Sequence, residues 1–218
     1  MRVYHFVNQQ FGLENLERRR LKIATLNDLN DPFELGIYST NSKLRSDFKS
    51  LKSRLAQAFG LLCFSRDWKN PVQWSHYADR HRGLCLGFDI PDELLTPVIY
   101  KSQLPKPDLP ILMGPGGPAT DHVKQILSTK FRHWRYENEV RCFVPIGNED
   151  GEKPGLYFTP FSNDLRLREV IVGHSSHVSR SQLSKALGDL RSEVSACKAR
   201  LAFRSYSIVK QRRGDLWE

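Results

Sequence analysis

An amphipathic pattern that runs directly into an apolar segment constrains the fold of this chain more than any other feature. Within residues 43–59, apolar side chains recur every three to four positions, and basic side chains take most of the positions between them. This spacing predicts a helix with one buried face, ended by Gly60. The nearly continuous apolar run at residues 61–65 predicts a central strand. A helix followed at once by a central strand indicates a mixed helical and sheet fold.

Strand and helix patterns alternate along the rest of the chain. We expect further strands at residues 3–7, 21–25, 83–90, 139–145, 156–158, 169–172 and 204–208, with residues 98–100 continuing the sheet and a hairpin-like turn at 148–155. We expect further helices at residues 13–16, 71–80, 121–133 and 181–194. No internal repeat or linker interrupts this pattern. The sequence therefore predicts one α+β domain over residues 1–218, in which amphipathic helices pack on a mostly antiparallel, split sheet.

Residues 103–119 interrupt the alternation. This segment contains five prolines and three glycines, so it cannot hold a regular element and is expected to be an exposed loop or a lid. Its Gly114-Pro-Gly-Gly117 stretch resembles a phosphate cradle. Because it lacks the Gly-Lys-Ser/Thr ending and a preceding strand, we reject a phosphate-binding loop.

The distribution of apolar residues and cysteines bears on the cellular compartment. No stretch approaches the roughly 20 consecutive apolar residues that span a bilayer. The N-terminal residues read as a strand and lack the apolar run of a signal peptide. The cysteines form no Cys-x-x-Cys pair, and most lie in apolar runs. We therefore expect a cytoplasmic protein with no membrane association and no structural metal.

An excess of basic residues favours acidic partners. Lysine and arginine outnumber aspartate and glutamate by 33 to 24, which gives a net charge of +9. Such an excess suits nucleic acid, nucleotides or acidic protein surfaces. Dense basic runs occur at Arg18–Arg20 and Arg212–Arg213, and the remaining basic residues are scattered. A merely solvated basic surface is an equally open interpretation.

Three segments carry the residue types of a chemical site. His5 lies on the first predicted strand, and Trp74 and Tyr77 lie three residues apart on a predicted helix, where they could form an aromatic wall. Glu137 and Glu139 alternate, so in an extended chain both would face the same side of the sheet. Two neighbouring carboxylates repel each other, and the pKa of one should rise. Structural roles stay open for each segment, with the carboxylates neutralised by Arg135 and Arg141.

The order of these motifs resembles that of a known family. The motifs are Asn30–Glu34, Cys63–Ser65, Trp74–Asp79, Gly83–Asp89, Trp134–Arg141 and Glu169–Gly173, and together they extend from about Val3 to Ile208. In this order they resemble the bacterial domain of unknown function 2971 family. The resemblance implies a stand-alone bacterial protein, and some members of the family occur near phage-defence genes.

A more distant resemblance concerns activity. The opening strand, helix and second strand are similar to those of ADP-ribosyltransferase toxins, although Cys63-Phe-Ser65 stands where the arginine-modifying branch has Ser-Thr-Ser. The resemblance implies an ADP-ribosyltransferase-like fold with NAD as co-substrate. It also implies that His5 orients NAD, that Tyr77 stacks on the nicotinamide and that Glu139 stabilises the cationic transition state. Glu137 would then position or deprotonate a nucleic-acid or protein acceptor.

The same resemblances extend the expected site. We expect Trp74, Ser65 and Asn30 to contribute to NAD binding beside Tyr77, and a toxin or phage-defence role to follow. Two other functions remain open. One is a non-catalytic nucleic-acid-binding or partner-binding module that uses the basic surface. The other is a metal-dependent nuclease or phosphohydrolase, with oxygen ligands for Mg²⁺ drawn from Asp31, Glu34, Glu137 and Glu139.

Overall fold

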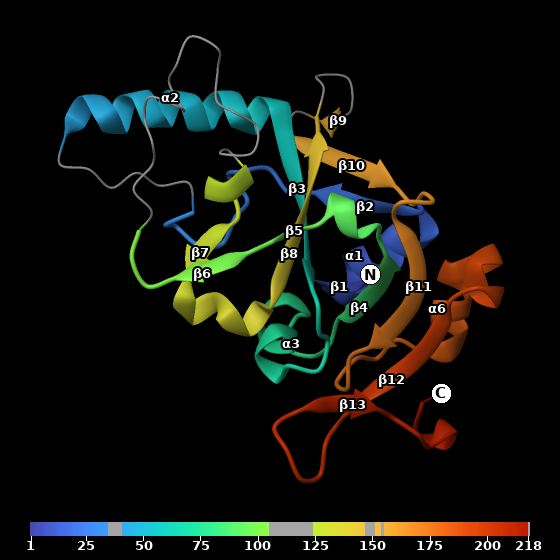
Figure 1. The fold of residues 1–218 in the computed structure, drawn as a ribbon. Helices are drawn as coiled ribbons and strands as arrows, with labels where there is room; N and C mark the ends of the chain where they lie inside the picture. Colours follow the sequence, from blue (N-terminus) through green and yellow to red (C-terminus); the bar gives the residue numbers. More distant parts are fainter. Residues whose placement is uncertain (35–40, 105–123, 147–150, 154, 218) are drawn as a thin grey trace.

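The computed structural model describes residues 1–34, 41–104, 124–146, 151–153 and 155–217 (Figure 1). Most of the proline- and glycine-rich segment 103–119 therefore lies outside the described residues, as do residues 121–123 of the helix predicted at 121–133 and residues 148–150 and 154 of the predicted turn. No helix in the described ranges combines the length and apolar character needed to cross a bilayer.

A large sheet organises the chain. Its eight strands, in spatial order, are β13 (Ile208–Lys210), β12 (Ser195–Leu201), β11 (Arg166–Val172), β4 (Leu84–Asp89), β1 (Arg2–Val7), β3 (Phe59–Ser65), β8 (Glu139–Pro145) and β5 (Thr96–Pro97). Neighbours in this order are antiparallel, except that β11 and β12 are parallel. The predicted α+β domain with a mostly antiparallel sheet is confirmed at this level.

Two smaller sheets flank the large one. The first joins β2 (Arg20–Ile23), β10 (Leu156–Pro160) and β9 (Gly151–Lys153) in antiparallel pairs. The second is a parallel pair of β6 (Ile99–Lys101) and β7 (Thr129–Phe131). The prediction that residues 98–100 continue the main sheet is therefore wrong. Ile99 and Tyr100 instead pair with the segment that leads toward Glu137, and this pairing brings β7 beside the candidate site.

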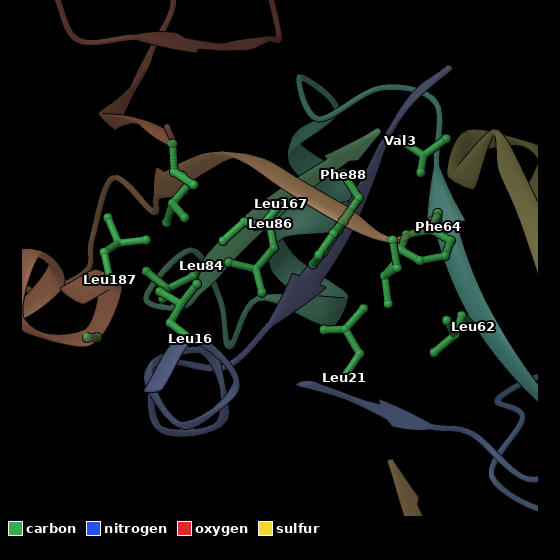
Figure 2. Close-up of a cluster of buried hydrophobic side chains, with 14 of the residues drawn as sticks. Val3, Leu16, Leu21, Leu62, Phe64, Leu84, Leu86, Phe88, Leu167 and Leu187 are labelled. Atoms are coloured by element: carbon green, nitrogen blue, oxygen red, sulfur yellow. The ribbon is translucent and has the colours of Figure 1, made fainter. Parts of the chain in front are cut away.

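Four α-helices and four 3₁₀ helices have bounds in the described chain. They are α1 (Gln9–Glu17), α2 (Ser42–Ala58), α3 (Pro71–Tyr77), α6 (Arg180–Leu187), η1 (Asp92–Leu94), η2 (Arg132–Glu137), η3 (Gly188–Ser192) and η4 (Gly214–Leu216). The core packs largely between the main sheet and α1 and α6, where Leu16 and Leu187 meet Leu84 and Leu86 (Figure 2). A second cluster buries the apolar face of α2 against Leu61 and Leu127.

The apolar face of α2 agrees with the predicted helix, but its end does not. Phe48, Leu51 and Leu55 are buried as the spacing predicted, and Asn41 caps the first turn. The helix ends at Ala58, and Gly60 is a strand residue paired with Val144. A Cβ atom at Gly60 would lie 2.1 Å from Cγ2 of Ile23, so glycine is required here by close packing.

Other predicted elements were wrong in type or extent. Residues 124–126 of the helix predicted at 121–133 are helical, but the prediction is wrong from Thr129 on, where β7 pairs with β6 and η2 follows. The strand predicted at 204–208 begins only at Ile208, and β12 was missed because its polar residues obscure the strand pattern. The helix predicted at 181–194 ends at Leu187 and continues as η3. The error at 129–133 lies where strand pairing overrides a local pattern, whereas the helix at 181–194 stops at Gly188, which has a positive φ.

Candidate functional site

A cavity of about 150 Å³ opens where β1, β3 and β8 lie side by side. Ser65 on β3 is in register with Tyr4 on one neighbour and with Glu139 on the other, so the three strands place these residues in one row. The lining residues are Tyr4, His5, Phe6, Leu29, Asn30, Cys63, Phe64, Ser65, Gln73, Tyr77, Lys130, Glu137, Glu139 and Arg141. A dry cavity of this volume accommodates one six-membered aromatic ring.

Most of the residues predicted for the site line this cavity. His5, Asn30, Ser65, Tyr77, Glu137 and Glu139 do so, although they come from five separate segments. Trp74 does not. It is fully buried in a core cluster, where its Nε1 atom donates to the carbonyl of Trp68 at 2.5 Å and its ring meets the edge of Phe6. The core-packing interpretation of Trp74 therefore holds, and Tyr77 alone of the two contributes an aromatic wall.

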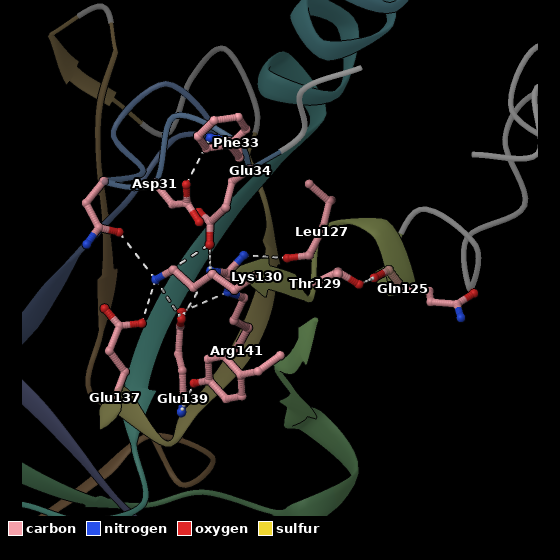
Figure 3. A network of polar contacts seen from close by, with 12 residues as sticks. Asp31, Phe33, Glu34, Gln125, Leu127, Thr129, Lys130, Glu137, Glu139 and Arg141 are labelled. Carbon is pink, nitrogen blue, oxygen red and sulfur yellow. Dashed lines mark hydrogen bonds and ion pairs between the residues drawn. The ribbon is translucent and has the colours of Figure 1, made fainter. Parts of the chain in front are cut away.

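The glutamate pair is brought together by a turn and not by an extended strand. Glu137 ends η2, Asn138 adopts a left-handed conformation with φ 46° and ψ 48°, and Glu139 begins β8. The premise that residues 137–139 are extended is therefore wrong. Asparagine tolerates this left-handed conformation better than most residues. The turn nevertheless directs both carboxylates at the same ammonium group, that of Lys130 (Figure 3).

Lys130 is a charged site residue that the sequence did not reveal. Its Nζ atom lies 2.6 Å from Oε2 of Glu137, 3.1 Å from Oε2 of Glu139 and 3.3 Å from Oδ1 of Asn30. In the helix predicted at 121–133 it would have been one more surface lysine. The short strand β7 instead turns its side chain inward, and its neighbours in sequence, Thr129 and Phe131, give no local signal of this.

Arg141 completes the ion-pair network on β8. Its Nε atom donates to Oε1 of Glu139 at 2.8 Å, and its guanidinium also contacts Glu34 and the carbonyl of Leu127. Arg141 was predicted as a neutralising partner and takes that position, whereas Arg135 is exposed. Three buried carboxylates therefore face two buried cations (Figure 3). With the carboxylates ionised, the site carries an excess of negative charge.

The two glutamates differ in their tendency to ionise. Burial opposes ionisation of Glu139, but Arg141 and Lys130 outweigh it and lower the pKa of Glu139 to about 2. For Glu137, burial is the largest effect and raises the pKa above its ordinary value, against the opposing contacts with Lys130 and Tyr77. One pKa of the pair rises as predicted, that of Glu137, but its main cause is burial, and the predicted repulsion by Glu139 contributes less. Such a split pair combines a permanent anion with a group able to exchange a proton.

His5 and Tyr77 are held in defined orientations on the cavity wall. Nδ1 of His5 lies 3.1 Å from the carbonyl of Cys63. Because a carbonyl only accepts, Nδ1 carries the hydrogen and Nε2 is an acceptor. Burial lowers the pKa of His5, so the ring is neutral. The hydroxyl of Tyr77 donates to Glu137 and accepts from Nδ2 of Asn30 at 2.5 Å.

Ser65 has its hydroxyl engaged in a local turn. The hydroxyl donates to the carbonyl of Asp67 at 2.8 Å and accepts from the backbone N–H of the same residue at 3.1 Å. It therefore shapes the wall beside Glu139, and its hydrogen is already committed. Ser65 lines the cavity as predicted without offering a free donor to a ligand.

The arrangement does not favour the metal-dependent alternative. Within the described residues, no group of three or more histidine, cysteine, aspartate or glutamate side chains is arranged to hold a metal ion. The ammonium of Lys130 lies between Glu34, Glu137 and Glu139, where a cation bound by these carboxylates would sit. A second positive charge there would be repelled.

Comparisons of the sequence with protein-family models and with curated proteins, and of the fold with solved structures, returned no match. The resemblances to the domain of unknown function 2971 family and to ADP-ribosyltransferases therefore stay predictions. The case for a function depends on the geometry of the cavity and its ion-pair network.

Proposed function

We propose that this protein transfers ADP-ribose from NAD, either to an acceptor or to water, through an ADP-ribosyltransferase-like fold. The observation that carries the proposal is the buried, ionised Glu139 in the wall of a ring-sized cavity beside Tyr77 and His5. A toxin or phage-defence effector is the biological context that suits an enzyme of this kind.

The dimensions and walls of the cavity suit the nicotinamide ring. Its volume of about 150 Å³ matches one six-membered aromatic ring. The Tyr77 ring and the neutral imidazole of His5 offer flat surfaces for stacking. Nε2 of His5 is an acceptor, so it suits the amide N–H₂ of nicotinamide. Nicotinamide in NAD is cationic, and the ionised carboxylate of Glu139 in the cavity wall supplies negative charge beside it.

The ion-pair network suits the transition state of glycosyl transfer. The bond between the ribose carbon and the ring nitrogen breaks, and its electron pair leaves with nicotinamide. The ribose carbon becomes electron-deficient, and a fixed carboxylate such as Glu139 stabilises that charge without reorganising. The acceptor oxygen or nitrogen then bonds to the ribose carbon and gives up its proton. Glu137, whose pKa is raised, is the base that we assign to that proton.

The remainder of the dinucleotide needs room outside the cavity. Tyr77 lines the cavity on one side and a polar surface hollow of about 810 Å³ on the other. That hollow is lined by polar and charged side chains, namely Asn8, Gln9, Gln10, His76, Tyr77, Asp79, Arg82 and His177. A molecule with its ring beside Tyr77 therefore has a polar surface next to it for its ribose and phosphate groups.

The test is release of nicotinamide from NAD by wild type, Glu139→Gln and Glu169→Gln. Glu169 is the matched control because it is as buried as Glu139 but pairs with Lys210 and does not line the cavity. We expect Glu139→Gln to lower the rate by about 100-fold or more. We expect Glu169→Gln to retain the rate once the folded fraction is matched by circular dichroism.

Two results would overturn the proposal. One is a folded wild-type protein that neither releases nicotinamide nor gains thermal stability with NAD. The other is an equal loss of rate in both glutamine variants, since that would assign the effect to folding. If Glu139→Gln retained full biological function, the alternative of a non-catalytic binding module would be favoured instead.

A further inference from the structure

The loop between β12 and β13, residues 202–207, projects from the end of the main sheet (Figure 1). Its base is anchored: the N–H of Ile208 donates to the carbonyl of Lys69 at 2.8 Å, and the side chain of Ile208 is buried. Its tip carries Phe203, which is 91% exposed, and Tyr206, which is 101% exposed. Two large rings thus stand in solvent on an anchored support.

Basic side chains lie near Phe203, one of these rings. A surface groove of about 720 Å³ runs between the loop and the Trp68–Lys69 segment. Four basic residues line it against one carboxylate, and they are Lys69, Arg200, Lys210 and Arg212 with Glu169. Lys210 is paired with Glu169 at 2.5 Å, whereas Lys69 and Arg212 have no ion-pair partner among the described residues. The groove therefore has positive charge available for an acidic ligand.

Arg200 links the charge to the rings. Its guanidinium carbon lies 4.7 Å from the centroid of the Phe203 ring, so a cation already stacks on one face of that ring. Phe203 is nevertheless almost fully exposed, which leaves most of the ring open to a further flat group. A phosphate beside Arg200 and a base on Phe203 could be held at the same time.

We propose that this groove, with Phe203 and Tyr206, binds single-stranded nucleic acid. Unpaired bases would stack on the two rings, while the phosphates would contact Lys69, Arg200 and Arg212. An acidic peptide would pair with the basic side chains but has no flat groups to stack on the two exposed rings. A duplex would match the charge, but its bases are stacked internally and do not reach the rings.

The triple-arginine run that first indicated a polyanion site is occupied by structural contacts. Arg19 donates to the carbonyls of Leu16, Ala186 and Leu187 and pairs with Asp189. Arg20 lies over the ring of Phe158, with its guanidinium carbon 3.6 Å from the ring centroid. Arg19 and Arg20 are therefore engaged within the fold, and the basic residues of the groove are the better candidates for contacts with phosphates.

The groove adjoins the candidate site. Tyr4 lines both the cavity that holds Glu137 and Glu139 and the groove that holds Phe203 and Arg200. A strand lying in the groove would pass beside the cavity wall. The binding itself does not depend on the proposed function, and it is measured without NAD.

The experiment is fluorescence anisotropy of the full chain with labelled oligonucleotides of about 12 nucleotides, both DNA and RNA, with duplex DNA and polyglutamate as competitors. The variants are Phe203→Ala combined with Tyr206→Ala, and Arg212→Glu. Matched controls are Phe11→Ala, an exposed ring on α1, and Lys49→Glu, the same charge reversal on α2. Thermal unfolding of each variant verifies the fold.

We expect the loss of the two rings to weaken binding at least about fivefold for each ring. Arg212→Glu should weaken binding and reduce the steepness of its salt dependence, while both controls retain wild-type affinity. The proposal is overturned by no binding at low salt, by ring variants that bind like wild type, or by controls that lose as much. Equal displacement by polyglutamate would also overturn it, because a generic polyanion surface would then suffice.

Discussion

The ammonium nitrogen of Lys130 lies 2.6 Å from a carboxylate oxygen of Glu137, and both side chains are almost completely buried. The same ammonium contacts Glu139 and lies 3.6 Å from Oε1 of Glu34. Removing one member of a buried ion network leaves its partners uncompensated in a medium that solvates charge poorly. Lys130 therefore determines both the integrity of the site and the ionisation of its carboxylates.

Substitution Lys130→Met should destabilise the fold by about 3–5 kcal/mol, measured as the free energy of unfolding in urea. The control Lys22→Met removes a half-exposed lysine paired with Asp28 and should cost less than about 1 kcal/mol. Adding Glu137→Gln to Lys130→Met should recover part of the loss, because one uncompensated carboxylate is removed. A double variant less stable than the sum of the single changes would contradict this account.

The stability of the fold should fall steeply in acid because of Glu139. Its pKa is about 2 in the folded protein against an ordinary value of 4.5, so its stabilising contribution is complete above pH 4.5 and is lost as pH falls toward 2. The contribution is on the order of 3 kcal/mol. Urea unfolding between pH 6 and pH 2 should therefore show a shallower acid loss in Glu139→Gln than in wild type. If the free energy of unfolding fell equally with pH in wild type and in Glu139→Gln, the lowered pKa assigned to Glu139 would be refuted.

Glu137 should lower the stability of the fold as pH rises, which is opposite to the effect of Glu139. Burial raises its pKa in the folded protein, so the unfolded chain ionises first as pH rises through the ordinary value of 4.5. The fold then loses stability until Glu137 itself ionises. Glu137→Gln should remove this decline on the neutral side of pH 4.5. If Glu137→Gln instead reduces the loss of stability below pH 4.5, the roles of the two glutamates are reversed.

Two substitutions of Tyr77 distinguish the stacking role of its ring from the effect of its hydroxyl on the pKa of Glu137. Tyr77→Phe keeps the ring but removes the hydroxyl that donates to Glu137 and lowers its pKa. Activity that needs ionised Glu137 should then begin at higher pH, while the KM for NAD stays within about twofold. Tyr77→Ala should raise KM, because the ring is lost. A pH profile unchanged in Tyr77→Phe would show that the hydroxyl does not control Glu137, and Tyr206→Phe serves as an exposed control.

Trp74 should matter for stability and not for NAD binding. Trp74→Phe removes the indole N–H that satisfies the carbonyl of Trp68, and an unsatisfied buried acceptor costs about 1–3 kcal/mol. The melting temperature should fall while the KM for NAD is retained below it. A large rise in the KM for NAD at an unchanged melting temperature would show that Trp74 contributes to NAD binding after all.

Local patterns in the sequence predicted the elements whose burial follows from their own periodicity. The strand at 139–145 has the predicted bounds, Pro71 begins α3 as its helix-start position suggests, and the buried face of α2 matches the apolar spacing. The proximity of Glu137 and Glu139 was also predictable, because only one residue separates them. What was wrong was the local conformation, since Asn138 is left-handed.

Contacts between distant segments could not be predicted in this way. Lys130 reaches Glu137 because β7 pairs with β6, and that pairing replaces part of a helix that local spacing favoured. Phe203 and Tyr206 stand on a loop whose anchor, Lys69, is more than a hundred residues away along the chain.

The sequence by itself therefore determined the composition of the core, the side of each strong helix and strand that is buried, and the pairing of two carboxylates. The tertiary structure decided which cation lies between those carboxylates, which aromatic ring lines the cavity and which arginines are free to face a ligand. Side-chain periodicity is a property of the local backbone. Charge compensation in a buried site depends on strands that meet only when the whole sheet has formed.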